Sequence, residues 1–399
     1  MKQSTARRLL LIICTLLFAA GPAFATVTIK MAPDDPRIAL QEGEGGGEVL
    51  GVTVSHVGLD AVEIDGQRWA VVRVPGAHNL MLRGEPSLPY LTTEYLLGRS
   101  GGIDLELMGA TIREIDLESH GLAGVAPSKG HFGRDVDPDS VPWSFDPKIY
   151  GSSDAYPLAD AWLDDPFISG PIRAQTSRIP VVRWRAADNI LLVLEEMRFR
   201  VVPDPKAPNP RLRSDPPMTG VFSQLTRRMV NVAPEVELDN PFVEAGRMLV
   251  IADDDFLDEI QPLVDWNTRV GYPTVLVPTS VTGTSAAAIK SYIQGVYDES
   301  ESLTWIILVG DSQQIPTLTG VNSQHSPCDP CYTKLEGNDN RPDAAISRIS
   351  AQNGAQVTAQ VTKILAYEGQ PDQGSAGTWY TAGMGVASSD IGGSPAYYD

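Results

Sequence analysis

The sequence predicts two domains of different class, an all-β sandwich followed by an α/β domain with a parallel sheet. Short apolar segments without helical spacing, separated by Gly, Pro, Asn and Asp, fill residues 26–202. This texture is typical of antiparallel β structure. From residue 247 onwards, apolar runs rich in β-branched residues alternate with segments whose apolar residues recur at helical spacing. Such alternation predicts β-α-β units, and the 399 residues are enough for two or three domains.

The composition argues against some classes of binding partner. Hydrophobic residues make up 42% of the chain, which is enough for packed cores, and the net charge is −19. A charge of this sign argues against nucleic acid and against an anionic membrane surface as partners. It suits a secreted protein that binds cations such as Ca²⁺.

The first 25 residues have the pattern of a secretory signal peptide. Basic residues near the start precede an apolar stretch at residues 9–20, and Ala23-Phe24-Ala25 forms an A-x-A site. Cleavage is therefore predicted after Ala25. The apolar stretch is too short for a stable membrane span, and no later stretch is long enough. We expect export, to a secreted, extracellular or cell-surface location.

Residues 203–246 are predicted to be a linker and activation segment. Six prolines with interleaved charges favour an extended chain; they are Pro203, Pro205, Pro208, Pro210, Pro216 and Pro217. The pair Arg227-Arg228 follows. A dibasic pair in an accessible segment is either a processing site or an ordinary solvated charge pair.

Three strands and three helices are expected in the α/β domain, which we assign to residues 247–399. The expected strands are residues 248–252, 274–277 and 305–309, because each is a short apolar run. Helical spacing predicts helices from Asp255 as N-cap to Gly271, from Thr284 or Ser285 onwards, and over residues 353–368. Residues 380–387 are expected to begin a further strand.

Acidic residues follow the third expected strand. Asp311 lies just beyond its carboxyl end, where open α/β sheets bind ligands, although an acid there also caps turns and helices. Further along, Asp339 and Asp343, with the backbone carbonyls of Glu336 and Arg341, present oxygen ligands of the kind that Ca²⁺ prefers. The alternative is a solvated acidic turn.

Two cysteines remain after the signal peptide. Cys328 and Cys331 form a C-x-x-C pair, which in an oxidising compartment is either a local disulfide or two thiols. A zinc site would need more ligands than these two and His325 provide. A redox pair opening a helix is disfavoured by the neighbouring prolines.

Several stretches of the α/β domain together resemble the gingipain-like cysteine peptidases, peptidase family C25. They include Asp265-Trp266-Asn267, residues 286–293, residues 303–311 and Gly337-Asn338-Asp339. Residues 84–89 are similar to a weaker marker of that family's propeptide. The resemblance therefore covers a propeptide and the first half of a catalytic domain.

The resemblance implies a secreted zymogen, in which a β-sandwich propeptide domain acts as the intramolecular inhibitor of a caspase-like α/β endopeptidase that cleaves protein or peptide substrates. It also implies a calcium ion held by Asp311, Asp339 and Asp343, with backbone carbonyls of Glu336 and Arg341.

The family's catalytic dyad is a His of a His-Gly motif and a nucleophilic Cys. No histidine of this chain lies in that context; the five are His56, His78, His120, His131 and His325. We therefore expect the sequence to be a fragment that ends before the dyad and has no activity by itself. The alternative is a non-catalytic exported binding or structural protein with the same fold.

Overall fold

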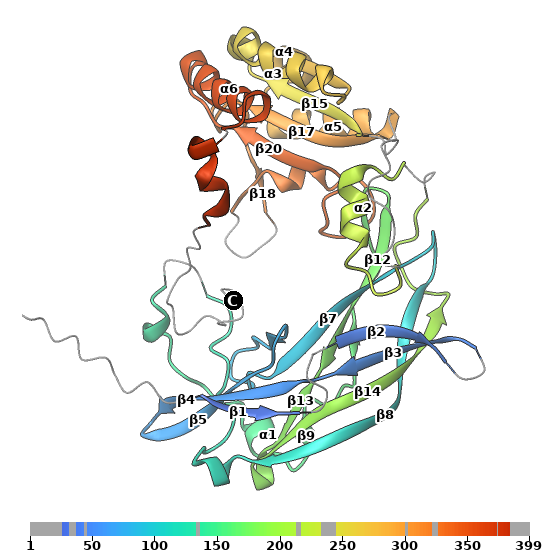
Figure 1. The fold of residues 1–399 in the computed structure, drawn as a ribbon, viewed down its shortest axis with the longest axis vertical. Coiled ribbons are helices and arrows are strands. Elements are labelled where there is room, and N and C mark those ends of the chain that lie inside the picture. Colours follow the sequence, from blue (N-terminus) through green and yellow to red (C-terminus); the bar gives the residue numbers. More distant parts are fainter. Residues whose placement is uncertain are drawn as a thin grey trace, which may run out of the picture.

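The computed structural model describes residues 26–31, 37–43, 46–132, 136–212, 217–232, 245–299, 302–320, 326–372 and 374–383. The predicted signal peptide, with its cut after Ala25, lies outside the described residues. Figure 1 shows the β-rich N-terminal domain below and the α/β domain above. No helix in the described residues is long and apolar enough to cross a membrane.

The N-terminal domain consists of three antiparallel sheets. One has the order β1-β4-β5, formed by Val27–Lys30, His56–Ile64 and Gln67–Arg73. The second has the order β10-β12-β7-β6, with β11 beside β12; its strands are Trp162–Leu163, Ile172–Pro180, Pro89–Leu96, His78–Asn79 and Phe167–Ser169. The third has the order β2-β3-β14-β13-β9, with β8 beside β14; its strands are Arg37–Glu42, Glu48–Thr53, Ile190–Asp204, Val182–Arg185, Ala155–Tyr156 and Gly102–Asp116.

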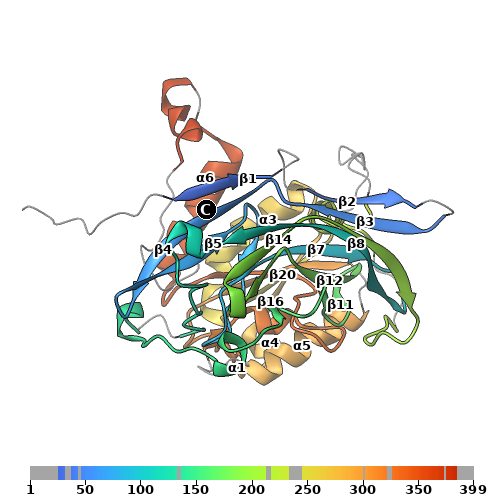
Figure 2. The ribbon, with the colours of Figure 1, turned by 90° about the horizontal axis from the view of Figure 1, so that it is seen from below.

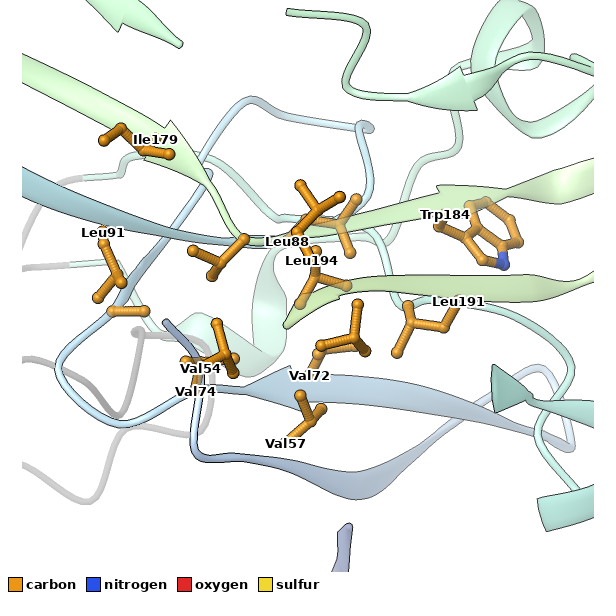
Figure 3. Packing of buried hydrophobic residues seen from close by; sticks show 14 of the residues in the cluster. Val54, Val57, Val72, Val74, Leu88, Leu91, Ile179, Trp184, Leu191 and Leu194 are labelled. Atoms are coloured by element: carbon orange, nitrogen blue, oxygen red, sulfur yellow. The ribbon is translucent and has the colours of Figure 1, made fainter. Parts of the chain in front are cut away.

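One hydrophobic core joins these sheets. Figure 2 shows the long strands β8 and β14 side by side, and their pairing continues from Asp116 opposite Ile190 to Gly102 opposite Asp204. Alternate residues of the strands point inward, and Figure 3 shows side chains such as Val54, Val72 and Leu194 gathered between the sheets. Burial of these apolar side chains is the main force that holds the domain together.

The α/β domain contains a parallel sheet with helices on both faces. The sheet order is β16-β15-β17-β20, formed by Thr274–Pro278, Arg247–Ala252, Leu303–Val309 and Ala345–Ile349. Helices α3 (Leu257–Arg269) and α6 (Gly354–Gly369) pack on one face, and α5 (Ala286–Glu299) packs on the other. Short elements complete it: α4 (Thr279–Thr282), β18 (Leu318–Thr319), β19 (Pro327–Cys328) and η5 (Pro330–Thr333). The predicted fold class is confirmed, an α/β parallel sheet preceded by an all-β domain.

Two local predictions for the α/β domain are wrong. Asp255 is not an N-cap: it lies inside a 3-10 helix, η4 (Asp254–Phe256), whose N-cap is Asp253, and α3 follows directly with Phe256 at its N-cap position. The expected strand at residues 380–387 begins instead within a 3-10 helix, η6 (Gly374–Thr381), and residues 384–387 lie outside the described residues. Strand β20 was not predicted, because its residues lack a continuous apolar run.

Described parts of the segment 203–246, predicted as a linker, form regular structure. Strand β14 continues to Asp204, and helix α2 (Gly220–Thr226) follows. The ring of Phe222 packs with Phe167 and Ile172 of the N-terminal domain. This part of the chain is therefore docked on the β-rich domain.

Candidate functional site at the domain junction

Asp311 lies at the carboxyl end of β17, as predicted. Its carboxylate accepts hydrogen bonds from Gln352 Nε2 at 3.0 Å, from the backbone N–H of Ser312 at 2.8 Å and from Ser350 Oγ at 3.3 Å. The hydrogen bond from Gln352 contributes most to lowering the pKa of Asp311. Asp311 therefore ties the end of β17 to the segment that leads into α6.

The acidic loop 335–343 lies at the opposite end of the same strands. Trp305 pairs with Ala345 and Val309 with Ile349 in parallel register, so Asp343 precedes the start of β20 while Asp311 follows the end of β17. At about 3.3 Å per residue, the two aspartates are separated by roughly 16 Å or more along the sheet. One ion cannot contact both.

Asp343 is fully buried at the junction of the two domains. Its Oδ2 accepts the backbone N–H groups of Leu335 at 2.7 Å and Glu336 at 2.8 Å, and its Oδ1 accepts that of Gly170, in the N-terminal domain, at 3.1 Å. Burial raises the pKa of Asp343 to about 7, and the three N–H donors oppose this rise.

Asp339 contacts the N-terminal domain as well. Its Oδ2 accepts the backbone N–H of Ile168 at 2.8 Å and the Asn209 side-chain amide at 2.9 Å, while its Oδ1 accepts the N–H of Arg341 at 2.8 Å. Hydrogen bonds to an ionised carboxylate are stronger than those between neutral groups. The loop therefore presents its carboxylates to N–H donors of the other domain.

Glu336 and Arg341 complete the loop. Glu336 Oε2 lies 3.1 Å from Arg211 Nη1 and 3.0 Å from the Tyr297 hydroxyl, and the side chain of Arg211 is only 1% exposed. Glu336 Oε1 is buried and has no hydrogen-bond partner among the described residues. The Arg341 guanidinium lies 4.4 Å from the centre of the Phe167 ring and pairs with Glu94 at 3.4 Å.

The five predicted calcium ligands therefore do not surround one point. Four belong to the acidic loop 335–343, and the fifth, Asp311, lies at the opposite end of the sheet. In the part of the chain that the structure describes, no three His, Cys, Asp or Glu side chains are grouped to hold a metal ion. The arrangement fits an interdomain contact better than a single metal centre, and calcium binding stays a prediction.

Cys328 and Cys331 form a disulfide with a Cα–Cα distance of 5.4 Å. Asp329 between them makes a bidentate ion pair with Arg348, at 2.6 Å and 2.7 Å. Arg348 Nη1 also donates to the carbonyls of Gly310 and Ile315, both at 2.9 Å. The disulfide loop is thereby connected to the carboxyl end of the parallel sheet.

No catalytic pair is formed among the described histidines and cysteines. His56, His78, His120 and His131 all lie in the N-terminal domain, and the two cysteines are bonded to each other. His325 lies outside the described residues. Among the described residues, therefore, no free cysteine thiol lies beside a histidine.

The predicted processing pair lies directly after α2. Arg227 and Arg228 are exposed, but Thr226 and Met229 on either side are buried. Val230 donates its N–H to the carbonyl of Glu94 at 2.9 Å. The pair is accessible at its side chains, while its backbone is held against β7.

Sequence spacing did not identify Asn209 and Arg211 as site residues. Both lie in the Pro-rich segment, where polar residues are ordinarily solvated. An Asn between two prolines was the one local signal, because Asn tolerates the left-handed conformation, and Asn209 has φ 56°.

The fold and the junction define a class, an α/β domain that is held by a β-rich N-terminal domain of the same chain. Comparison with known proteins adds a similarity to a known family. Residues 243–395 match the profile of peptidase family C25. The predicted resemblance to the gingipain-like cysteine peptidases is thereby confirmed.

Known relatives extend the similarity beyond that match. The chain is 26% identical to Gingipain R1 of Porphyromonas gingivalis over 295 residues, covering 73% of this chain and 29% of that protein. It is 22% identical to Lys-gingipain HG66 of the same organism over 370 residues, covering 91% and 21%. Because both matches are longer than the stretch from residue 243 to 399, they include part of the N-terminal domain. The chain spans less than a third of the length of either relative.

A solved structure of similar type is the complex of Porphyromonas gingivalis RgpB pro- and mature domains. The TM-score is 0.43 and the identity 20%, over 49% of this chain and 98% of that chain.

Proposed function

We propose that the chain is part of a secreted cysteine endopeptidase zymogen of the gingipain type. The observation that carries this proposal is the match of residues 243–395 to peptidase family C25. The expected substrates are proteins or peptides. The α/β domain supplies the scaffold of the peptidase, and the described residues of this chain do not bring a His and a free Cys together. The chain by itself is therefore predicted to be inactive.

The N-terminal domain is proposed to be the intramolecular inhibitor. It contacts the α/β domain through Ile168, Gly170 and Asn209, which bind the loop 335–343. Such contacts between domains of one chain hold an inhibitory domain in place without a covalent bond. Its removal would then expose the loop 335–343.

An activity assay on the protein in its full secreted form tests this proposal. Fluorogenic peptides would be incubated with it before and after proteolytic removal of the N-terminal domain, with and without a thiol-alkylating reagent. Peptide cleavage that appears after removal and is abolished by alkylation supports a cysteine peptidase zymogen. Absence of thiol-dependent cleavage in both states would refute it.

A second function is a non-catalytic exported binding or structural protein. The observation that favours it is the lack of a His–Cys pair in the described residues. The same assay distinguishes the two functions, because a binding protein would show no thiol-dependent peptide cleavage after its N-terminal domain is removed.

A further inference from the structure

We propose that the Cys328–Cys331 disulfide is a reducible bond that holds residues 310–316 in place, and that a dithiol reductant releases them by opening it. Residues 310–316, which we name the sheet-end segment, follow β17 at the carboxyl end of the parallel sheet. The sequence alone leaves a disulfide and two thiols as alternatives, and the proposed peptidase gives the pair no role. The inference therefore goes beyond the proposed function and does not depend on it.

The ring closed by this disulfide is small and accessible. The two cysteines are three residues apart and partly exposed, and the neighbouring Pro327 and Pro330 are exposed. A bond between residues this close restricts the unfolded chain less than one that closes a long loop. Its effect is therefore mainly local. Exposed disulfides are also the ones that exchange readily with thiols.

Asp329 connects the disulfide ring to the sheet. It lies between the two cysteines, so the ring restricts the backbone that carries it. Its carboxylate pairs with Arg348 at 2.6 Å and 2.7 Å, and Arg348 Nη1 donates to the carbonyls of Gly310 and Ile315, both at 2.9 Å. Because a guanidinium is planar and rigid, its orientation toward these two carbonyls follows from the position of Asp329.

Tyr332 makes a second connection between the ring and the sheet-end segment. Its side chain is fully buried, and its hydroxyl donates to the carbonyl of Pro316. Its backbone N–H donates to the carbonyl of Asp329 at 3.0 Å, inside the disulfide ring. The residues in and beside the ring thus hold the sheet-end segment at Pro316 as well as through Arg348.

The place of this segment in the fold gives the bond its consequence. Open α/β sheets bind ligands beyond the carboxyl ends of their parallel strands. Asp311 begins the turn there, and its carbonyl accepts the N–H of Ile315 at 2.8 Å. Opening of the disulfide would therefore change the backbone geometry at the ligand-binding end of the sheet, while the strands keep their pairing.

The opening step takes two electrons and two protons from the dithiol. One thiolate of the reductant attacks a sulfur of the pair, the bond between Cys328 and Cys331 breaks, and a mixed disulfide forms. The second thiol of the reductant then attacks this mixed disulfide. The protein is left with two thiols, and the reductant leaves as a disulfide. The backbone of Asp329 is no longer fixed by the ring.

The test uses the full chain, with dithiothreitol as the dithiol. Alkylation with iodoacetamide under native conditions, followed by mass spectrometry, counts the thiols at Cys328 and Cys331. Hydrogen–deuterium exchange measures the opening of the sheet-end segment, with strand β14 as internal reference. Reduction should expose both thiols and speed exchange in the segment by at least about tenfold, because its hydrogen bonds to a charged group are weakened.

Three variants separate the disulfide from the ion pair. Cys328→Ser with Cys331→Ser should exchange in this segment like reduced wild type and should not respond to dithiothreitol. Asp329→Asn keeps the disulfide but should show the faster exchange without reductant. The matched control is Asp188→Asn, which removes a carboxylate from another bidentate pair, with Arg185 of the N-terminal domain, and should leave the segment unchanged.

Three results would overturn the inference. If dithiothreitol exposes no thiols in the folded chain, the bond is not a reducible one. If both thiols appear and exchange in the sheet-end segment stays the same, the disulfide does not hold that segment. Equally faster exchange in β15 and α3 would mark a bond that stabilises the whole domain. Because none of these measurements uses peptidase activity, failure of the proposed function would not be mistaken for failure of this inference.

Discussion

The contact between Gly170 and Phe222 tests how helix α2 is held on the N-terminal domain. Gly170 has φ +54°, and a Cβ built there would lie 2.7 Å from Cε1 of Phe222. Phe222 is 5% exposed and packs with Phe167, Ile172 and Met229. Gly170→Ala should therefore push α2 away from the N-terminal domain.

The magnitudes follow from the structure. Phe222→Ala removes a buried ring and should cost about 3–5 kcal/mol. Gly170→Ala should cost about 1–2 kcal/mol for the left-handed backbone, and about 1–3 kcal/mol more for overpacking against the ring. The overpacking disappears once the ring is removed. The double variant should therefore be more stable than the sum of the single variants predicts, by about 1–3 kcal/mol.

Urea unfolding of the wild type, the two single variants and the double variant measures this coupling. A second assay follows trypsin cleavage at Arg227-Arg228, which should become faster in Phe222→Ala because local undocking exposes the backbone. Leu225→Ala, which changes a partly exposed residue of the same helix, is the control for the second assay. Strictly additive costs, or unchanged cleavage, would show that α2 is not docked through Phe222.

Two further predictions concern the ends of the parallel sheet. Arg348→Lys should lower the free energy of unfolding by about 1–3 kcal/mol, because lysine cannot keep the bidentate pair with Asp329 while donating to two carbonyls; an exposed Arg200→Lys exchange is the control, and equal stability of both variants would refute the assignment. The raised pKa of Asp343, about 7, should make the free energy of unfolding fall as pH rises from about 4 to 7, by at most about 4 kcal/mol, because the folded state holds a proton that the unfolded state has released. Urea titrations at several pH values should show this slope reduced in Asp343→Asn, and an unaltered slope would contradict it.

The α/β domain could be predicted because its local signals agree with its tertiary structure. Strands β15 and β17 are buried on both faces and therefore read as apolar runs, and the edge strand β16 is also an apolar run although Val275 is exposed. The helices keep a regular apolar stripe; in α6, Val357 and Val361 are buried. Strand β20 was not predicted from the sequence because it combines partly exposed residues with Arg348, whose partners are distant in sequence.

Because β20 was not predicted, the sequence analysis placed Asp311 and Asp343 in one site, whereas the structure separates them. A strand that pairs in parallel with β17 must begin beside the start of β17, so the chain between them has to return across the sheet. Had β20 been recognised, the separation of Asp311 from Asp343 would have followed. The partners of the loop, by contrast, lie more than a hundred residues earlier, at Ile168 and Asn209, and no spacing rule connects them.

We expect Ca²⁺ and the N–H donors of the N-terminal domain to compete for the same carboxylate oxygens of loop 335–343. In the docked chain, Asp339 Oδ2 is occupied by two donors of the N-terminal domain, and Asp343 Oδ1 by one. Departure of that domain would leave Asp339 Oδ2 and Asp343 Oδ1 without these donors, and Glu336 would lose Arg211 while keeping the Tyr297 hydroxyl. A hard cation such as Ca²⁺ is suited to replace them.

The expected outcome is that Ca²⁺ raises the melting temperature of the separated α/β piece more than that of the uncut chain, since a ligand stabilises the state that binds it. Calorimetry at matched Ca²⁺ and chelator concentrations measures both shifts. Equal shifts would show that the ion, if it binds, binds away from loop 335–343. No shift in either form would remove the calcium prediction altogether and leave loop 335–343 as a docking surface alone.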